Sequence, residues 1–429
     1  MAKYEAYIDS GFEWLGQIPA SWKMVLLSQV VTQVKNKNSE LMEQNLLSLS
    51  YGRIKRKPID TSGGLLPESF DGYNIIEAND IVLRLTDLQN DHRSLRVGLA
   101  SERGIITSAY TTMRPRNQGS AKYLYYLLHT FDIRKGFYGM GSGVRQGLNY
   151  DEVKKMKLPM PTLAEQAAIA EYLDRETERI DAIIAEAKAS IEEYKAWKAS
   201  IIYEAVTKGL APNAEMKDSG ITWIGRMPAS WKTMRIKDLG DARNGLTYSP
   251  EEQVDEGKGI LVLRSSNVQG GKLVFTDNVY IGSEIPSELM LQQGDILICS
   301  RNGSRKLIGK NAYIEEDNKY SFGAFMMALR PKIRNKKYVY WLLNSGVFGY
   351  YLPMFFTSTI NQLTRENFRN MVVPYCDDEF VQKGIVEYLD TKVAQIDSVI
   401  EDKERLIDDM EHYKKSLIFE VVTGKRKVV

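Results

Sequence analysis

Apolar residues recur at steps of three, four and seven along two long, otherwise charged stretches of the chain. The stretches begin near Ala164 and Glu379, run for about 44 residues without proline, and end near Gly209 and Gly424, where helix C-caps belong. The period predicts two long helices with a coiled-coil seam. The seam residues are Ile169, Leu173, Ile180, Ile184, Ile191 and Ile201 in the first stretch, and Ile385, Leu389, Ile396, Ile400, Ile407 and Leu417 in the second.

A helix of about 44 residues is roughly 66 Å long. An amphipathic helix cannot bury its apolar stripe alone, so we expect the two helices to pack on each other as an antiparallel coiled coil. A globular domain would then lie at each end, related by a pseudo-two-fold axis. The alternative is that each helix packs on its own globular domain or on a second chain.

The remaining segments carry shorter apolar and β-branched runs separated by Gly- and Ser-rich turns, which predicts mixed α/β domains and an α+β fold class overall. We place the domains at residues 1–158 and 211–374, and the long helices within 159–210 and 375–429. The expected strands are Ile81–Leu85, Tyr110–Met113, Gly259–Leu263, Asp295–Cys299 and Phe325–Leu329, and the expected short helices are Lys122–Thr130 and Lys337–Ser345.

The chain repeats itself after roughly 210 residues. The segment DSGFEWLGQIPASWK from Asp9 returns as DSGITWIGRMPASWK from Asp218, identical at ten of fifteen positions. The segment EYLD from Glu171 returns from Glu387. Such a period is too long for a solenoid and indicates two copies of one globular domain, each followed by a long helix. We expect the tryptophans of the repeated segment to pack against the helical pair; they are Trp14, Trp22, Trp223 and Trp231.

Charge is distributed unevenly, although the net charge is only +2. Each long helical stretch carries −4, so the rest of the chain carries +10. A basic remainder is typical of a protein that binds a polyanion, but unequal solvation of different surfaces would also produce it. No apolar run is long enough to cross a membrane. The two cysteines, Cys299 and Cys376, exclude a disulfide scaffold and fit a reducing cytoplasm.

Catalytic and metal-site patterns are missing from the sequence. The Gly139–Gly143 segment lacks the strand and helix of a dinucleotide turn, and Gly303–Asn311 departs from the phosphate-binding loop. The three histidines, His92, His129 and His412, have no ligand spacing, and His129 is expected at a capping or surface position. We therefore expect no catalytic residue, no metal and no cofactor in this chain.

Clusters of basic and amide side chains in the predicted domains suit nucleic acid. Arginine matches guanine, Asn and Gln match adenine, and Lys and Ser suit phosphates. The alternative is that these are ordinary surface loops. The candidate residues are Ser50, Tyr51, Arg53, Lys55, Arg56, Arg84, Arg145 and Gln146 in the first domain, and Arg264, Ser266, Asn267, Arg301, Asn302, Arg305, Asn361 and Gln362 in the second.

The candidate loops differ between the two copies, whereas the framing segments match. SYGRIKRK from Ser50 has RSSNVQGG as its counterpart, and GSGVRQG from Gly141 has TSTINQL. One scaffold with two different sets of loops would bind two different half-sites.

Three motifs together resemble the DNA-specificity subunit of Type I restriction–modification systems. They are DSGxxWxGxxPASW, the Leu-Pro-Met-Pro-(x)3-Glu-Gln segment from Leu158 to Gln166, and EYLD opening a long helix. The second copy departs at Pro374-Tyr375-Cys376, which lacks the second proline, and at Val381-Gln382, which lacks the glutamate. This departure concerns only the turn before the second long helix.

The resemblance implies a non-catalytic subunit whose globular domains are target-recognition domains, each for half of an asymmetric, bipartite double-stranded DNA sequence. The helical pair would set the gap between the halves. Two methyltransferase subunits using S-adenosylmethionine would dock on it, and restriction subunits driven by ATP with Mg would join them. Two other functions remain open from the residues alone: a coiled-coil scaffold that binds nucleic acid without sequence preference, and an enzyme with an unrecognised site.

Overall fold

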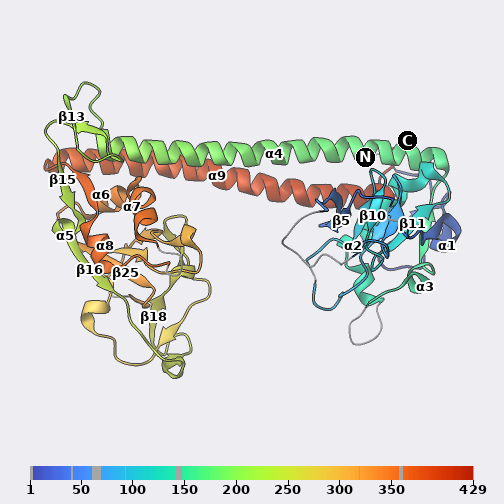
Figure 1. Cartoon of the computed structure of the whole chain (residues 1–429), viewed down its shortest axis with the longest axis horizontal. Coiled ribbons are helices and arrows are strands. Elements are labelled where there is room, and N and C mark those ends of the chain that lie inside the picture. Colours follow the sequence, from blue (N-terminus) through green and yellow to red (C-terminus); the bar gives the residue numbers. More distant parts are fainter. Residues whose placement is uncertain are drawn as a thin grey trace. The chain divides into compact units, whose positions relative to one another are not determined.

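The computed structural model describes residues 3–39, 42–59, 69–91, 93–140, 147–317, 319–356 and 361–428 (Figure 1). The chain forms two compact units. The first comprises Met1–Lys188 and Glu404–Val429, and the second Ala189–Lys403. Each unit therefore contains one globular domain and parts of both long helices. Among the described residues, no helix has both the length and the apolar character needed to span a membrane.

Both domains are built on a four-stranded antiparallel sheet of the same strand order. The order is β4 (Val31–Val34), β11 (Thr111–Pro115), β8 (Ile81–Leu83), β9 (Val97–Leu99) in the first, and β16 (Gly240–Asn244), β25 (Met326–Pro331), β22 (Ile296–Cys299), β23 (Asn311–Tyr313) in the second. Four of the strands expected from sequence fall in these sheets, and the fifth is β18 (Ile260–Leu263). The duplication and the predicted α+β fold class are confirmed.

Smaller elements also recur. The shared pairs are β1 (Tyr7–Asp9) with β2 (Gln17–Pro19), β13 (Met216–Asp218) with β14 (Arg226–Pro228), β3 (Lys23–Leu26) with β12 (Lys157–Met160), and β15 (Lys232–Arg235) with β26 (Val372–Tyr375). The shared helices are α1 (Leu27–Val30) with α5 (Ile236–Leu239), and α2 (Ala121–Ile133) with α6 (Lys336–Leu343). The two expected short helices are α2 and α6. Three further short helices are α3 (Tyr150–Val153), α7 (Val347–Phe355) and α8 (Arg365–Asn370).

The remaining strands differ between the domains. The first has the hairpin β5 (Leu47–Ser50) and β6 (Arg53–Arg56), and the pair β7 (Asn74–Ile76) and β10 (Gly104–Ile106). The second has β19 (Val268–Gln269) with β20 (Lys272–Leu273), and a second four-stranded sheet of β17 (Gln253–Val254), β21 (Tyr280–Ile281), β18 and β24 (Tyr320–Phe322). These are the regions where the candidate loops of the two copies diverge.

A buried carboxylate clamps the sheet in each domain. Asp80, just before β8, accepts bonds of 2.7 and 2.8 Å from Arg114 of β11. Asp295, just before β22, accepts bonds of 2.9 and 2.7 Å from Arg330 of β25. Both aspartates are buried, and two parallel bonds from a guanidinium fix geometry as well as charge. This repeated pair gives a common reference point for comparing positions in the two copies.

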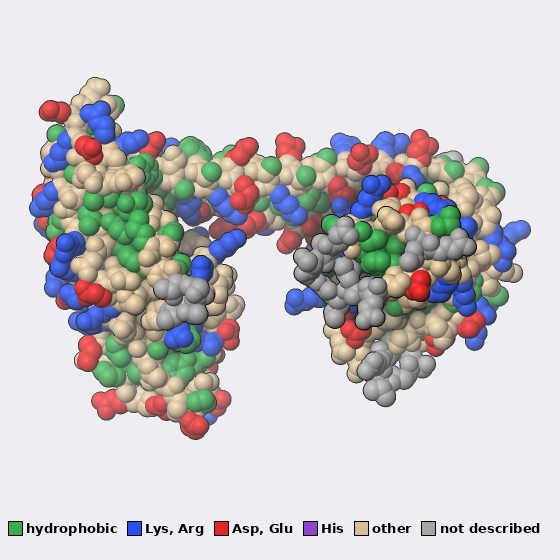
Figure 2. All heavy atoms as spheres, viewed as in Figure 1, with side chains coloured by type: hydrophobic (Ala, Val, Ile, Leu, Met, Phe, Trp, Pro, Cys, Tyr) green, Lys and Arg blue, Asp and Glu red, His purple; other side chains and the backbone are tan. Residues whose placement is uncertain are grey.

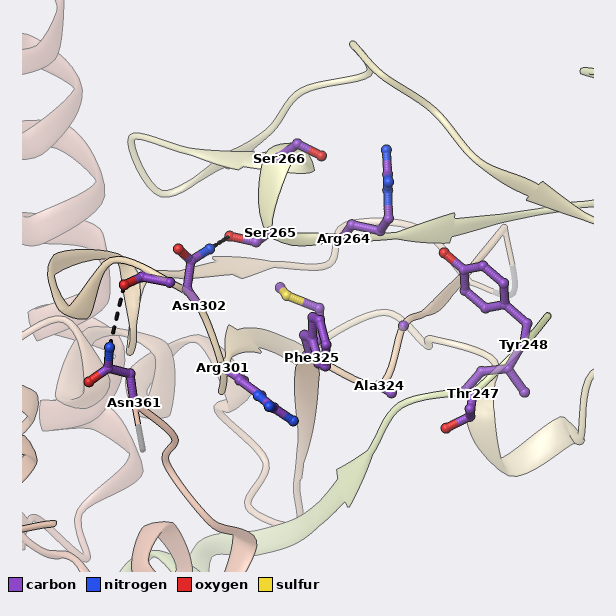
Figure 3. A pocket seen from close by; sticks show the side chains of 14 residues that line it. Thr247, Tyr248, Arg264, Ser265, Ser266, Arg301, Asn302, Ala324, Phe325 and Asn361 are labelled. Carbon is purple, nitrogen blue, oxygen red and sulfur yellow. Dashed lines mark hydrogen bonds between the residues drawn. The ribbon is translucent and has the colours of Figure 1, made fainter. Parts of the chain in front are cut away.

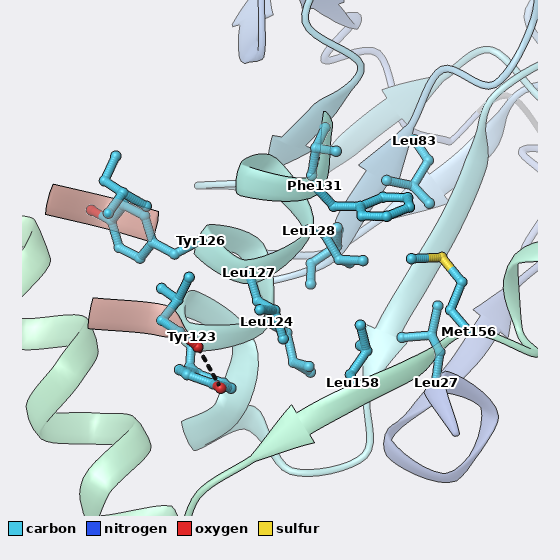
Figure 4. Close-up of a cluster of buried hydrophobic side chains, with 14 of the residues drawn as sticks. Leu27, Leu83, Tyr123, Leu124, Tyr126, Leu127, Leu128, Phe131, Met156 and Leu158 are labelled. Atoms are coloured by element: carbon cyan, nitrogen blue, oxygen red, sulfur yellow. Dashed lines mark hydrogen bonds between the residues drawn. The ribbon is translucent and has the colours of Figure 1, made fainter. Parts of the chain in front are cut away.

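The largest apolar core lies in the first unit. Leu124, Leu127 and Leu128 of α2 pack in one cluster with sheet residues and with the long helices (Figure 4). The fully buried hydroxyl of Tyr123 donates to the carbonyl of Pro159 at 2.7 Å and lies 3.2 Å from the carbonyl of Val422. Residues from both ends of the chain therefore complete this core.

The long helices are α4 (Leu163–Lys208) and α9 (Glu379–Val422). In the first unit Lys414 of α9 donates at 2.7 Å to both carboxylate oxygens of Asp181 on α4. In the second, Lys198 of α4 donates at 2.7 and 3.0 Å to Asp397 on α9. Each unit joins one end of α4 to the opposite end of α9, so the predicted antiparallel pairing is confirmed inside each unit. Figure 2 shows side chains of both charges along the exposed side of these helices.

The predicted seam residues are buried, except that Ile407 is partly buried. Ile169, Leu173, Ile180 and Ile184 belong to the same cluster as α2 and the sheet. The seam therefore packs on a globular domain as well as on the partner helix. The alternative that a long helix packs on its own globular domain thus also holds in part.

The repeated tryptophan segment holds the end of a long helix in each unit. Gly424, just past α9, has φ +73°, and Gly209, just past α4, has φ +72°. A Cβ on Gly424 would lie 2.3 Å from Pro19 and 3.2 Å from Trp22, and one on Gly209 would lie 3.2 Å from Trp231. The prediction is confirmed for these two tryptophans. Trp14 instead packs on Phe131 of α2, with ring centroids 4.9 Å apart, and Trp223 lies near Gly346.

The repeated EYLD segment ties each domain to its long helix. Asp174 of α4 accepts bonds from Lys122 and, at 2.8 Å, from the hydroxyl of Tyr126. Asp390 of α9 lies 2.9 Å from Lys337 and accepts a 3.0 Å bond from the indole of Trp341. The aspartate thus fixes α2 or α6 against the helix.

The turn before the second long helix is also preserved. The Gln166 amide donates to the carbonyl of Pro161 at 2.8 Å, and the Gln382 amide donates to Cys376 at 2.7 Å. The missing second proline therefore does not change this contact.

Candidate nucleic-acid interface

A cavity of about 790 Å³ in the second domain brings together candidate residues from distant parts of the sequence. Loops after β16, β18 and β22, the segment before β25, and residue 361 surround it (Figure 3). Five predicted residues line it, namely Arg264, Ser266, Arg301, Asn302 and Asn361. The exposed ring of Phe325 also lines it, with the guanidinium carbon of Arg301 5.0 Å from the ring centroid. The cavity therefore offers a cation, an aromatic face and several polar groups to one ligand.

Apart from Arg301, most of the candidate side chains in this domain already form hydrogen bonds or ion pairs with neighbouring residues. Arg264 donates to the Asp277 carbonyl at 2.7 Å and pairs with its carboxylate at 2.6 Å. Arg305 donates to the Asn361 side chain at 2.7 Å. The Asn302 amide donates to the Ser265 hydroxyl at 2.9 Å. These bonds fix the shape of the cavity wall. Gln362 forms an isolated antiparallel bridge with Arg301, just past the end of β22.

Asn267 has a different position from the one expected of a ligand contact. Its side chain is fully buried. The side-chain oxygen accepts the Arg264 amide at 2.9 Å, and the side-chain amide donates to the carbonyl of Val274 at 3.1 Å. Asn267 therefore holds its own loop in shape and has no free polar group to offer, so we leave it out of the proposed interface.

A cation at the same place in each domain holds a candidate loop by its carbonyl oxygens. Lys310, just before β23, donates to the carbonyls of Ser265 and Val268 at 2.5 and 2.9 Å. Arg96, just before β9, is fully buried and donates to four carbonyls between Arg84 and Asp91. Sequence reasoning missed both residues, because no local pattern distinguishes them from surface cations.

The β5–β6 hairpin presents the basic cluster of the first domain. Tyr51 at its turn is 73% exposed, and Arg53 is 71% exposed at its side chain, 3.7 Å from Asp181. Lys55 is exposed, whereas Ser50 is partly buried in the strand. Arg56 binds Glu102 through two nitrogen atoms, and this hydrogen bonding lowers the pKa of the Glu102 carboxyl. Tyr51, Arg53, Lys55 and Arg56 are all exposed here, and of these Arg56 is held most firmly, by Glu102.

Arg84 lies 3.6 Å from Asp91 and is about one-third exposed. Hydrogen bonds from Ser94 lower the pKa of Asp91 to about 2, so this carboxylate stays charged beside the arginine. The predicted residues Arg145 and Gln146 lie outside the described residues, as do His92 and the segment 357–360.

The described residues contain no group of three or more His, Cys, Asp and Glu side chains placed to hold a metal ion. His129, expected at a surface or cap, instead stacks on Tyr125 with ring centroids 5.4 Å apart. Burial lowers its pKa to about 4. The i, i+4 spacing on α2 accounts for the stacking, but the hairpin at Gly52 that covers His129 comes from a distant segment, which sequence reasoning could not place.

Comparison with known proteins gives two family matches in this chain. A family model described as "Type I restriction modification DNA specificity domain" matches residues 22–193 and 228–406. The MjaVIII specificity subunit of Methanocaldococcus jannaschii is 23% identical over 421 residues, 96% of this chain and 94% of that protein. The StySPI specificity subunit of Salmonella potsdam is 27% identical over 207 residues, 47% of this chain. That alignment spans 44% of the relative, less than half its length.

A solved structure described as the "structural basis underlying complex assembly and conformational transition of the type I R-M system" has the same fold. It aligns with a TM-score of 0.69 at 15% identity, over 94% of this chain and 98% of that one.

Proposed function

The chain belongs to the Type I restriction–modification DNA specificity family, and from this premise we propose that it is a non-catalytic subunit whose two domains each read one half of a bipartite DNA sequence. The observation that carries the proposal is the pairing of one repeated scaffold with two unlike sets of loops. Both domains share the central sheet, the Asp–Arg clamp and the tie to a long helix. Identical scaffolds position the loops, and different loops select different bases.

The interface of the first domain is formed by Ser50, Tyr51, Arg53, Lys55, Arg56 and Arg84, together with Arg145 and Gln146. The cavity residues, Arg305 and Gln362 form the interface of the second. Arginine supplies a fork for guanine, asparagine and glutamine suit adenine, and exposed lysine and serine suit phosphate. The +10 charge outside the long helices supports this assignment, since phosphate contacts supply much of the affinity of DNA-binding proteins.

The paired long helices set the gap between the two half-sites. The 46-residue helix α4 is continuous and contributes to both units. Its length, about 69 Å, is close to two turns of B-DNA at about 34 Å each. The apolar packing and the Lys–Asp bond that join the helices in each unit support the role of the pair as a spacer.

Two methyltransferase subunits using S-adenosylmethionine bind this subunit, and ATP-dependent, Mg-dependent restriction subunits join them. The repeated elements support two equivalent docking sites, because the Lys–Asp contact between the helices occurs once in each unit. Both cysteines are free and buried, which suits action in the cytoplasm.

The proposal is tested by sequencing methylated bases in cells that express the chain with its cognate methyltransferase subunit. We expect one split motif with two unlike segments and a constant gap. Binding that falls uniformly with salt, with no consistent methylated motif, would instead indicate a non-specific nucleic-acid scaffold. DNA modification or cleavage by the chain alone would indicate an enzyme.

A further inference from the structure

Arg301 lies just past the end of β22, an inner strand of the second domain's main sheet. It follows β22 by two residues, and its backbone amide donates to the carbonyl of Phe325 at 3.1 Å. On its other side it bridges Gln362, and the neighbouring Ser300 carbonyl accepts the Leu363 amide at 2.7 Å. The backbone is thus fixed from two directions.

The guanidinium of Arg301 rests against the ring of Phe325, which is 56% exposed at the cavity (Figure 3). Among the described residues, no hydrogen bond or ion pair engages its N–H groups, whereas Arg264 and Arg305 are held by Asp277 and Asn361. An arginine stacked on an aromatic ring keeps its planar fork free for a ligand and loses less conformational entropy when it binds.

We propose that Arg301 is the residue by which the second domain selects a guanine, donating to O6 and N7 at the base edge, with Phe325 holding the fork in place. This inference rests on the proposed function and names the base that the cavity reads. Guanine presents two acceptors at the spacing of the guanidinium fork, and no other base offers that pair in the major groove.

The first domain lacks an arginine stacked on an aromatic ring at the corresponding place. Arg301 stands six residues after Asp295 of the clamp, and Phe325 stands five residues before Arg330. The corresponding positions, counted from Asp80 and Arg114, are Thr86 and Ala109, both exposed. The first domain therefore has neither the fork nor its aromatic support at this place. A change at Arg301 should alter only one of the two half-sites.

The test uses the full chain expressed with its methyltransferase subunit, followed by sequencing of methylated bases. Arg301→Gln exchanges a guanine fork for an adenine-matching amide, so one guanine of one segment should become adenine or degenerate. Discrimination against other bases at that position should fall about 5- to 150-fold, which corresponds to about 1–3 kcal/mol. Arg301→Lys keeps the charge and loses the fork, so the same position should relax. The matched control is Arg334→Gln, an exposed arginine of the same domain bonded to Glu379, which should change nothing.

The two proposals fail in different ways. A wild-type chain without a split motif would overturn both the proposed function and this inference. A split motif that Arg301→Gln leaves unchanged, or changes in both segments, would overturn only the assignment of Arg301.

A second measurement is used if the complex with Arg301→Gln methylates no DNA, because sequencing then gives no result. The wild-type complex is titrated with its own duplex carrying 7-deazaguanine, which lacks N7, at each guanine in turn. One position should weaken binding about 10-fold, as for a lost hydrogen bond to a charged group, and Arg301→Gln should lose no further affinity there. Insensitivity at every guanine would overturn the proposal.

Discussion

Replacing Lys310 with Met removes the ammonium group that holds the loop from Ser265 to Val268. A hydrogen bond from a charged donor contributes about 1.5–3 kcal/mol net, and Lys310 makes two, at 2.5 and 2.9 Å. Methionine retains most of the apolar stem, and the released carbonyls can bind water when the loop relaxes. Two such bonds give about 3–6 kcal/mol, and Lys310 is partly exposed, so we expect the free energy of unfolding of the second unit to fall by about 3 kcal/mol, at the low end.

DNA binding should be affected separately from stability, because a released loop must be ordered again in the complex. Fixing one backbone residue costs about 1–2 kcal/mol. The buried side chain of Asn267 still holds the middle of the loop, so we count one released residue. Specific affinity should then fall about 5- to 30-fold. Binding to unrelated DNA, which depends mainly on phosphate contacts, should change much less.

The assay is a titration of the full chain with its methyltransferase subunit against labelled cognate and unrelated duplexes at two salt concentrations, together with thermal melting. Lys310→Arg is the matched control, because it keeps the charge and can reach both carbonyls. A lower melting temperature with an unchanged ratio of cognate to unrelated affinity would refute the reasoning, since Lys310 would then support the fold alone.

Inserting four residues, one helical turn, into one long helix should change the gap in the methylated motif and preserve both segments; changed segments would contradict the spacer model. Acid should destabilise the first unit through His129, whose folded pKa of about 4 lies below the ordinary value of about 6.5. The neutral imidazole fits its buried site, so the free energy of unfolding is highest above pH 6.5. It falls by up to about 3 kcal/mol as the pH drops towards 4. Melting curves of His129→Gln should lack this loss, and those of His412→Gln, on exposed α9 surface, should keep it. Gly424→Ala should lower the melting temperature more than Gly209→Ala. Both glycines have positive φ, but the new Cβ would lie 2.3 Å from Pro19 at position 424 and 3.2 Å from Trp231 at position 209. Equal effects would exclude the contact as the cause.

The elements that the sequence predicted correctly are those governed by local periodicity. The apolar seam residues of α4 and of α9 recur with the period of a helix, so both long helices were predictable to within a few residues. The internal repeat then implied two related domains. Pairing of the helices followed from the need to bury a stripe, although that stripe also packs on α2 and the sheet.

Roles that depend on contacts between distant segments could not be predicted. Asn267 in a polar turn has the same local signature as Asn302, yet one is buried in its loop and the other lines the cavity. Lys310 acts through loop carbonyls 42 and 45 residues away, and Arg96 acts through four carbonyls that lie 5 to 12 residues away. Arg301 was grouped with Arg264 and Arg305, and only the structure separates it from them by its partners.

The closing of the first core by the last turn of α9 has a consequence for biosynthesis. Tyr123 lies against the Val422 carbonyl, Tyr7 donates to Gly424 at 3.1 Å, and Lys425 donates to Leu15 at 2.6 Å. The first domain is synthesised before the second, but its apolar surface is covered only after residues 417–425 have left the ribosome. The second unit is one continuous segment and has no such delay. A nascent chain stopped before residue 417 would hold one finished domain and one exposed to chaperones and proteases.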